Sequence, residues 1–268
     1  MPKNKSNPSS SGTSIVLVTG ATSGFGEACA EKFAANGYHV IITGRRKERL
    51  AKIKTRLEKK YRIKILALPF DVRIKKQVFS VLENIPAEWK KIDILINNAG
   101  LAAGRDFFED ASLDDWETMI DTNVKGLIYV SRAVLPFMIK QEKGHIINIG
   151  SIAGKEVYEK GNIYCATKFA VDAISKAMRI DLLKHFIKVT AVHPGAAQTE
   201  FSMIRFKGDK EQARKVYEGY TPLTAENIAD IIYYCASLPP HVCINELVVS
   251  PLAQANSFYL HRAPSRNE

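Results

Sequence analysis

Short apolar runs alternate with helical stretches along almost the whole chain, and this rhythm limits the possible folds more than any other feature. Strict alternation of apolar strands with helices predicts a parallel sheet that is covered on both faces. Right-handed crossovers make such a sheet doubly wound. We therefore predict an α/β fold of three layers around a seven-stranded parallel sheet. The predicted strands cover 14–18, 39–43, 64–70, 92–96, 145–149, 189–192 and 244–249, and the main helices about 24–36, 47–60, 75–85, 113–139, 162–185 and 225–237.

The turn Thr19–Gly26 joins the first apolar run to the first helical stretch. It carries glycine at positions 20, 24 and 26, and no bulky side chain precedes Phe25. A strand-to-helix turn of this kind exposes backbone N–H groups at a helix N-terminus, where phosphate binds. Its spacing, Gly-x3-Gly-x-Gly, differs from the general dinucleotide fingerprint. A tight turn without a ligand explains this stretch alone equally well, so the rest of the chain must decide.

Polar or glycine-rich residues follow the predicted strands at their carboxyl ends. In a doubly wound sheet these ends lie on one rim, and ligands bind beyond it. The convergence of several such ends is stronger evidence for a binding site than any single motif. The residues that this arrangement brings to the rim are Gly20, Arg45, Asp71, Asn98, Ser151, Pro194 and Gly195.

Tyr164 and Lys168 lie four residues apart near a predicted helix start, so both side chains lie on one helix face. An ammonium beside a phenol favours the phenolate and would lower the phenol pKa from about 10. A phenol tuned in this way exchanges a proton with a carbonyl or alcohol oxygen, and Ser151 is placed to hydrogen-bond the same oxygen. Tyr-x3-Lys also arises by chance as a surface pair; the glycine turn and Ser151 favour the catalytic interpretation.

The residues after the second strand indicate the cofactor. A site for NAD places an acidic residue there, which accepts a hydrogen bond from the ribose 2′-hydroxyl. Here the sequence has Arg45 and Arg46 and no carboxylate. A guanidinium pairs with a 2′-phosphate, whereas a carboxylate repels it. We therefore predict NADP(H), read by Arg45 and Arg46 with help from Ser23; the alternative for either arginine is a solvated side chain.

Composition sets the broad class. A net charge of +10 over 268 residues favours anionic ligands, but it does not choose among a nucleotide, a nucleic acid and a membrane surface. No nucleic-acid-reading module and no membrane-length apolar run occur in the sequence, so we expect neither partner. The four cysteines lack metal or redox spacing, which predicts reduced thiols, no metal and a cytoplasmic protein. We expect a flexible tail over 1–12, one domain over 13–252 and a C-terminal tail over 253–268 that either folds onto a neighbour or is loose.

These motifs occur in the order found in the short-chain dehydrogenase/reductase family, which the chain resembles from about Ile15 to Val249. The resemblance implies a Rossmann-type fold and a catalytic tetrad in which Tyr164 is the acid/base, Ser151 polarises the substrate oxygen, Lys168 holds the nicotinamide ribose and Asn123 orders a water for proton relay. It also implies a homotetramer. The implied cofactor contacts are Gly20, Thr22, Ser23, Gly24, Phe25, Gly26, Arg45, Arg46, Asp71, Val72, Asn98, Ala99, Gly100, Tyr164, Lys168, Pro194 and Gly195.

Within that family the sequence is similar to the NADP-dependent 3-hydroxy acid dehydrogenases, also described as L-allo-threonine or L-serine dehydrogenases. The similarity includes Thr43–Leu50, Asp114–Asn123 and Thr199–Phe201. It implies oxidation at C3 of short 3-hydroxy acids such as 3-hydroxypropionate or 3-hydroxyisobutyrate, or reduction of the 3-oxo acid. The substrate would contact Ser151, Tyr164 and Arg205.

A small hydroxy acid needs a cation for its carboxylate, and Arg205 lies in the polar segment 196–224, where the family has its mobile substrate lid. The alternative for Arg205 and Lys207 is surface pairing with Glu200 or Asp209. A broad carbonyl reductase acting on neutral ketones or aldehydes would use the same tetrad and cofactor site. A non-enzymatic NADP sensor would be expected to have lost tetrad residues, and all four are present.

Overall fold

The computed structural model describes residues 13–263. The predicted tail over 1–12 lies outside the described residues, as do the last five positions of the predicted C-terminal tail. The strands are β1 Ile15–Val18, β2 His39–Gly44, β3 Ile65–Pro69, β4 Ile92–Asn97, β5 Gly144–Ile149, β6 Ile187–Pro194 and β7 Glu246–Val249. The α-helices are α1 Gly24–Ala35, α2 Lys47–Tyr61, α3 Lys75–Glu83, α4 Leu113–Ile120, α5 Leu127–Gln141, α6 Asn162–Asp181, α7 Phe201–Arg205, α8 Lys210–Lys215 and α9 Ala225–Ser237.

The seven strands form one parallel sheet in the order β3-β2-β1-β4-β5-β6-β7. The chain moves outward from β1 in one direction and then returns to β4 to build the other half. The prediction of a doubly wound seven-stranded parallel sheet is therefore confirmed. The point where the direction reverses, between β1 and β4, is where such sheets leave a crevice for a ligand.

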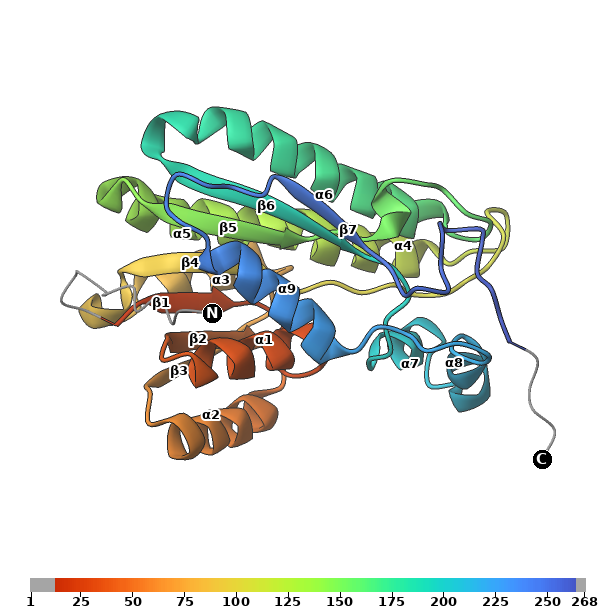
Figure 1. Ribbon diagram of the computed structural model, residues 1–268, viewed down its shortest axis with the longest axis horizontal. Coiled ribbons are helices and arrows are strands. Elements are labelled where there is room, and N and C mark those ends of the chain that lie inside the picture. The colour runs from red at the N-terminus through yellow and green to blue at the C-terminus, as the bar shows by residue number, and fades with distance from the viewer. Residues whose placement is uncertain (1–12, 264–268) are drawn as a thin grey trace, which may run out of the picture.

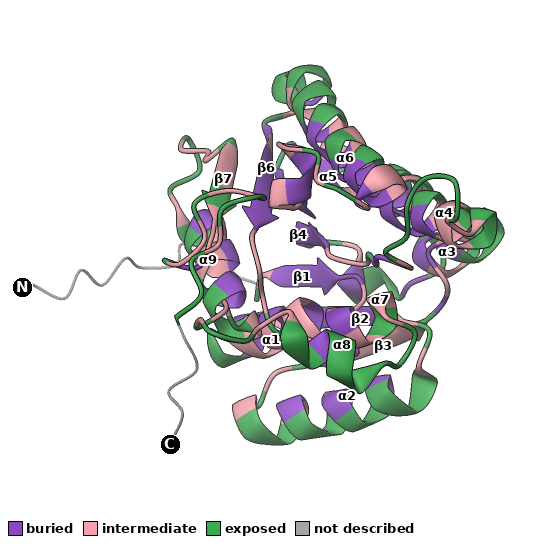
Figure 2. Ribbon diagram, turned by 90° about the vertical axis from the view of Figure 1, so that its right-hand side faces the viewer, coloured by how far each residue is buried: buried purple, intermediate pink, exposed green. Residues whose placement is uncertain are grey.

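Helices cover both faces of the sheet (Figure 1). Along β1, Val16 and Val18 pack against α1, α2 and α9, whereas Ile15 and Leu17 pack on the opposite face against α3 and α5. This alternation follows from the two-residue period of a strand, and burial on both faces explains why the strand is apolar at every position. Figure 2 shows the buried strands between the half-exposed helices. None of the helices within 13–263 is long and apolar enough to cross a membrane.

The predicted helix over about 113–139 is divided into α4 and α5, but the chain between them stays helical. Between α4 and α5 the backbone forms a π-helical segment, η2, over Asp121–Gly126. A π-helical turn has wider hydrogen-bonded rings than an α-helix and often occurs at functional sites. Asn123 lies in this segment and is buried.

Near its end, the predicted C-terminal tail contacts its own chain through Arg262, and contact with a neighbouring subunit stays a prediction. The guanidinium of Arg262 donates to the backbone carbonyls of Lys215, Val216 and Glu218 at the end of α8. Cations are favourable at this end of a helix because its last carbonyls lack partners. The tail therefore holds the segment that carries α7 and α8.

His145 in β5 gives the fold a specific sensitivity to acid. Its ring is 3% exposed, and Nε2 lies 2.7 Å from Thr190 Oγ1. Burial, aided by Lys188, lowers the pKa of His145 to about 3. The unfolded chain, with a histidine pKa near 6.5, therefore binds this proton first as the pH falls. The stability is complete above pH 6.5 and is lost progressively toward pH 3.

We expect His145 to account for about 2 kcal/mol of the stability lost between pH 6.5 and pH 5. Urea unfolding of the wild type and of His145→Gln at pH 7 and pH 5 measures this contribution. The variant should lose less stability on acidification than the wild type. His241→Gln, which changes an exposed histidine, is the matched control. Equal losses in all three proteins would contradict the assignment.

Candidate active site

A cleft runs along the carboxyl ends of β1, β4, β5 and β6, and it collects most of the residues predicted for the site. The glycine turn after β1, the loop after β4 and the segment after β6 all contribute residues to its lining. The predicted residues that line this cleft are Gly20, Ser23, Gly24, Phe25, Asn98, Ala99, Gly100, Ser151, Tyr164, Lys168, Pro194, Gly195 and Arg205.

Seven predicted residues lie outside the lining of the cleft. Asn123 lies behind its floor, and Gly26 is buried inside α1. Asp71 is held by the guanidinium of Arg73, and Val72 packs under Gly126. Arg45 and Arg46 follow the end of β2, and Thr22 lies in the glycine turn, where Arg46 donates to its Oγ1. The full set is Thr22, Gly26, Arg45, Arg46, Asp71, Val72 and Asn123.

The glycine turn is shaped to bring backbone close to a ligand. Gly20 and Gly24 have φ of +65° and +53°, which glycine adopts without strain. A Cβ on Gly26 would overlap the carbonyl of Gly20 and the side chain of Asn98. Ser23, at the N-cap of α1, makes no side-chain bond to the helix backbone. The first N–H groups of α1 therefore have no side-chain acceptor from Ser23. Free N–H groups at a helix N-terminus favour the binding of an anion.

The loops after β1 and β4 are joined by Thr19, which the sequence did not single out. Its Oγ1 accepts from the backbone N–H groups of Asn98 and Ala99, both at 3.0 Å. In return, Asn98 Nδ2 donates to the carbonyl of Thr19 at 2.8 Å. These bonds fix the two sides of the crevice relative to one another.

Arg46 reaches back from the end of β2 to the glycine turn. It donates to Thr22 Oγ1 at 2.6 Å and to Ser23 Oγ at 2.7 Å. Its other terminal nitrogen pairs with Glu200 at 2.9 Å, and Glu200 also pairs with Arg49. No carboxylate follows β2 in the sequence, but the fold brings one there from the segment after β6. Cationic guanidinium groups nevertheless predominate at this end of the cleft.

Tyr164, Ser151 and Lys168 meet at the centre of the cleft. Tyr164 lies in the first turn of α6 and is 8% exposed. Lys168 Nζ lies 5.9 Å from the centre of the Tyr164 ring and donates to the carbonyl of Ile149 at 3.0 Å. Ser151 follows the end of β5 and its Oγ accepts from the N–H of Ala153 at 3.1 Å. The predicted clustering of these three side chains is therefore present.

The expected electrostatic effect of Lys168 on Tyr164 requires correction. Burial raises the pKa of Tyr164, Tyr158 adds to the increase, and Ser151 and Arg205 oppose it. Burial lowers the pKa of Lys168 to about 8. Loss of water costs the phenolate more than the ammonium restores, because Nζ lies beyond hydrogen-bond distance and is engaged with Ile149. Tyr164 is thus protonated at neutral pH in this structure.

Asn123 fastens the loop after β4 to α6. Its Nδ2 donates to the carbonyl of Leu101 at 2.8 Å and to Thr167 Oγ1 at 3.0 Å, and its Oδ1 accepts from the N–H of Leu101 at 2.8 Å. A Cβ on Gly100 would lie 3.2 Å from Asn123 Oδ1 and 3.6 Å from Lys168 Nζ. Both groups therefore border the same small space beside Gly100. The implied water relay remains a prediction.

Arg205 lies beside Tyr164 and Tyr158 in the cleft instead of pairing on the surface. Its Cζ is 5.6 Å from the ring centres of both Tyr164 and Tyr158. Within 13–263 it makes no ion pair, and its Nε is buried without a hydrogen-bond partner. Glu200 is taken by Arg46 and Arg49, and Lys207 pairs with Asp115 at 2.7 Å. The surface alternative therefore does not hold for Arg205.

Tyr158 and Arg105 also line the cleft, and sequence reasoning missed both. Arg105 follows Gly104, whose N–H bonds the carbonyl of Arg205 at 3.0 Å. Tyr158 lies in the loop before α6, outside any motif with regular spacing. The only sequence signal for either was its position shortly after a strand end, in a loop too irregular to predict.

Comparison with known proteins agrees with this arrangement. The model of the short chain dehydrogenase family matches residues 14–210. The chain belongs to this family, and it is therefore a dehydrogenase of the class that acts on hydroxyl groups.

Individual relatives are more specific. The chain is 50% identical over 242 residues to the NADP-dependent 3-hydroxy acid dehydrogenase YdfG of Salmonella typhi, covering 90% of this chain and 96% of that protein. It is 44% identical to sulfoacetaldehyde reductase 2 of Chromohalobacter salexigens, covering 91% and 97%. The closed form of a serine dehydrogenase complexed with NADP⁺ superposes with a TM-score of 0.87 at 47% identity, covering 92% and 99%. The predicted cofactor and family agree with these names.

Proposed function

We propose that the protein is an NADP-dependent oxidoreductase that oxidises short 3-hydroxy acids at C3, or reduces the corresponding 3-oxo acids. The main support for an acidic substrate is the guanidinium of Arg205, which lies beside Tyr164 and makes no ion pair among the described residues. A carboxylate two bonds from the reacting carbon would place its negative charge there. Named relatives act on a 3-hydroxy acid, on serine and on sulfoacetaldehyde, and these compounds carry a carboxylate or a sulfonate.

NADP fits the residues of the cleft. The N-terminus of α1 has no side-chain cap, and the glycines beside it let a pyrophosphate approach the backbone closely. The guanidinium groups of Arg45 and Arg46 suit a 2′-phosphate. NADP⁺ supplies the hydride acceptor when it is bound. The further contacts proposed are Gly20, Thr22, Ser23, Gly24, Phe25, Gly26, Asp71, Val72, Asn98, Ala99, Gly100, Tyr164, Lys168, Pro194 and Gly195.

The chain's own groups supply the proton chemistry. In oxidation, the Tyr164 phenolate oxygen accepts the proton of the substrate hydroxyl, and in reduction the phenol returns it. Ser151 holds the same oxygen by a hydrogen bond. Lys168, whose Nζ lies 5.9 Å from the centre of the Tyr164 ring, would hold the nicotinamide ribose, and Asn123 holds the loop that borders Lys168. The hydrophobic contacts of Tyr164 with Phe201 exclude water from this centre.

Arg46 should determine the preference for NADP⁺ over NAD⁺. Removing its guanidinium in Arg46→Ala deletes a charge-assisted contact, so the Kd of NADP⁺ should rise roughly tenfold to a hundredfold. The Kd of NAD⁺ should change little. Titration calorimetry with both nucleotides measures the difference. Lys52→Ala, an exposed cation on α2, controls for net charge. A parallel loss of affinity for both nucleotides, or a wild type that prefers NAD⁺, would refute this role.

A broad carbonyl reductase acting on neutral ketones or aldehydes is the second candidate. Phe201, Ile204 and Phe206 line the same cleft and offer apolar contact to such substrates. Initial rates with NADP⁺ on L-serine, L-allo-threonine, 3-hydroxypropionate and 3-hydroxyisobutyrate, beside neutral secondary alcohols, distinguish the two. Activity confined to the neutral alcohols would replace the proposed substrate class and leave the reaction class unchanged.

We further propose a homotetramer that works in the cytoplasm. Exposed apolar side chains on α5, α6 and the end of β7, such as Ile128, Phe169 and Val248, support contact with other subunits. The four cysteines are free thiols, three of them buried, which supports a reducing compartment. Sedimentation analysis tests the assembly.

A further inference from the structure

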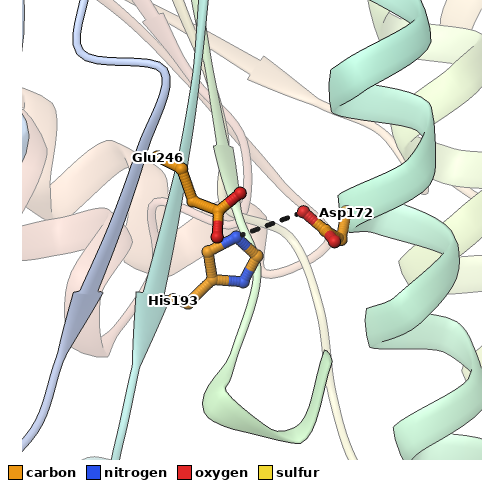
Figure 3. A group of neighbouring side chains, drawn as sticks. All are labelled: Asp172, His193 and Glu246. Carbon is orange, nitrogen blue, oxygen red and sulfur yellow. Dashed lines mark ion pairs between the residues drawn. The ribbon is translucent and has the colours of Figure 1, made fainter. Parts of the chain in front are cut away.

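Behind Ser151 lies a cluster of charged and ionisable side chains that the proposed mechanism does not use. Asp172 comes from α6, His193 from β6 and Glu246 from β7 (Figure 3). His193 is completely buried, and Asp172 is 8% exposed. Asp172 follows Lys168 by four residues, so it lies one turn further along the same helix. The cluster therefore connects α6 to the strands that carry Ser151 and Gly195.

The geometry of this cluster resembles a metal site, but an ammonium already fills it. The ligand atoms of the three residues lie within 4.8 Å of one another. Lys155 Nζ lies 2.9 Å from Asp172 Oδ1 and 2.5 Å from Glu246 Oε1. A metal ion would have to displace this cation from between the carboxylates. The cluster is therefore not a metal site, and its contact with Ser151 is structural.

The hydrogen-bond partner of His193 fixes its tautomer. Nδ1 lies 3.2 Å from the carbonyl oxygen of Ser151, and a carbonyl only accepts, so Nδ1 must carry the hydrogen. Nε2 faces Asp172 Oδ1 at 3.6 Å and has no hydrogen-bond partner. Burial and Lys155 lower the pKa of His193, whereas Asp172 and Glu246 oppose them. The ring is therefore neutral near pH 7 and is protonated on Nδ1 alone.

The imidazole also fixes the backbone just before Ser151. A Cβ on Gly150 would overlap the His193 ring, so the ring packs directly against this peptide. The N–H of Gly150 donates to the carbonyl of Val192 at 2.7 Å, which also ties this residue to β6. A small displacement of a reacting group can cost a large factor in rate. The position of Ser151 therefore depends on His193 through its carbonyl.

We propose that His193 is a positioning residue that holds Ser151 in place for catalysis. The proposal rests on the proposed function, in which Ser151 bonds the substrate oxygen. His193 does not line the cleft and touches neither substrate nor cofactor. Its contribution should therefore appear in kcat and leave the binding of NADP⁺ unchanged.

Three substitutions of His193 distinguish the contribution of Nδ1 from that of Nε2. His193→Leu removes the donor, and kcat should fall on the order of tenfold, with the Kd of NADP⁺ and the KM of the hydroxy acid within about twofold of wild type. His193→Asn places an amide N–H near the position of Nδ1 and should restore most of kcat. His193→Gln places its amide near Nε2 and should not. Equal kcat values for the Asn and Leu variants, or rescue by Gln alone, would overturn the proposal.

A double-mutant cycle excludes a merely structural role. In a Ser151→Ala background, His193→Leu should cause almost no further loss of kcat, because its effect passes through Ser151. Additive losses would overturn the proposal. If His193→Leu does not fold, His193→Gln replaces it in the same cycle, because it also removes the donor to the Ser151 carbonyl and keeps a polar side chain in the cluster.

A spectroscopic measurement does not require activity. The ¹⁵N shifts of labelled histidine, with the His193 signals assigned by their loss in His193→Asn, report which ring nitrogen carries the proton. We expect a neutral ring protonated on Nδ1 at pH 7.5, with Asp172, Lys155, Lys176 and Glu246 as the charged groups of its surroundings. A ring protonated on Nε2 would overturn the proposal. A wild type with this tautomer but without dehydrogenase activity would instead refute the proposed function.

Discussion

Replacing Tyr164 by phenylalanine should lower kcat for alcohol oxidation by roughly a hundredfold to ten-thousandfold, because the only proton acceptor aligned with the substrate oxygen is lost. The ring and its packing against Phe201 remain, so the Kd of NADP⁺ should stay within a factor of about three. Steady-state kinetics and nucleotide titration measure the two effects separately. Tyr158→Phe, in a second tyrosine of the same cleft, is the matched control and should retain kcat.

The pH dependence gives the same residue a second test. Burial raises the pKa of Tyr164, and oxidation requires its deprotonated form. The oxidation rate of the wild type should therefore rise toward alkaline pH, and the reduction rate should fall. A Tyr164→Phe variant that keeps more than a tenth of wild-type kcat, or an oxidation rate that is highest in acid, would remove Tyr164 from the acid/base role.

Replacing Arg205 by alanine should lower kcat/KM for hydroxy acids by roughly tenfold to a hundredfold, mainly through KM. The expected size follows from one charge-assisted hydrogen bond, about 1.5–3 kcal/mol. Neutral alcohols gain nothing from a guanidinium, so their kcat/KM should change less than threefold. The ratio of the two effects is the quantity to measure, since it cancels any general disturbance of the cleft.

Lys207→Ala is the matched control for Arg205. Lys207 is a cation of the same segment, but its ammonium is already paired with Asp115, away from Tyr164. It should leave the preference for acids unchanged. An equal loss for acids and neutral alcohols in Arg205→Ala would show that Arg205 supports the segment around α7 and does not bind the carboxylate.

Local pattern was sufficient to predict the sheet and the clustering of Ser151, Tyr164 and Lys168 in one cleft. Strand β1 is an uninterrupted apolar run because both of its faces are buried, so its limits are visible in the sequence. Tyr164 and Lys168 lie close together because four residues span about one helical turn. Ser151 lies near them because it follows a strand whose carboxyl end shares an edge of the sheet with the other parallel strands. These are consequences of short-range geometry, which sequence spacing encodes.

Contacts between distant segments were not predictable in this way. Glu200 pairs with Arg46 across 154 positions, and its position depends on how the segment after β6 folds back. The effect of Lys168 on Tyr164 was wrong because the degree of burial, which dominates both pKa values, is a property of the assembled cleft. The π-helical turn at Asn123 and the hydrogen bonds of Arg262 to the end of α8 likewise arise from packing, and no local sequence motif predicts them.

The most direct test of the proposed function compares one substrate with and without its negative charge. The kcat/KM with NADP⁺ is measured for 3-hydroxyisobutyrate and for its methyl ester, which keeps the reacting hydroxyl and removes the carboxylate. The proposed function predicts that the acid is oxidised at least about tenfold more efficiently than the ester. An ester oxidised as efficiently as the acid, or better, would contradict it.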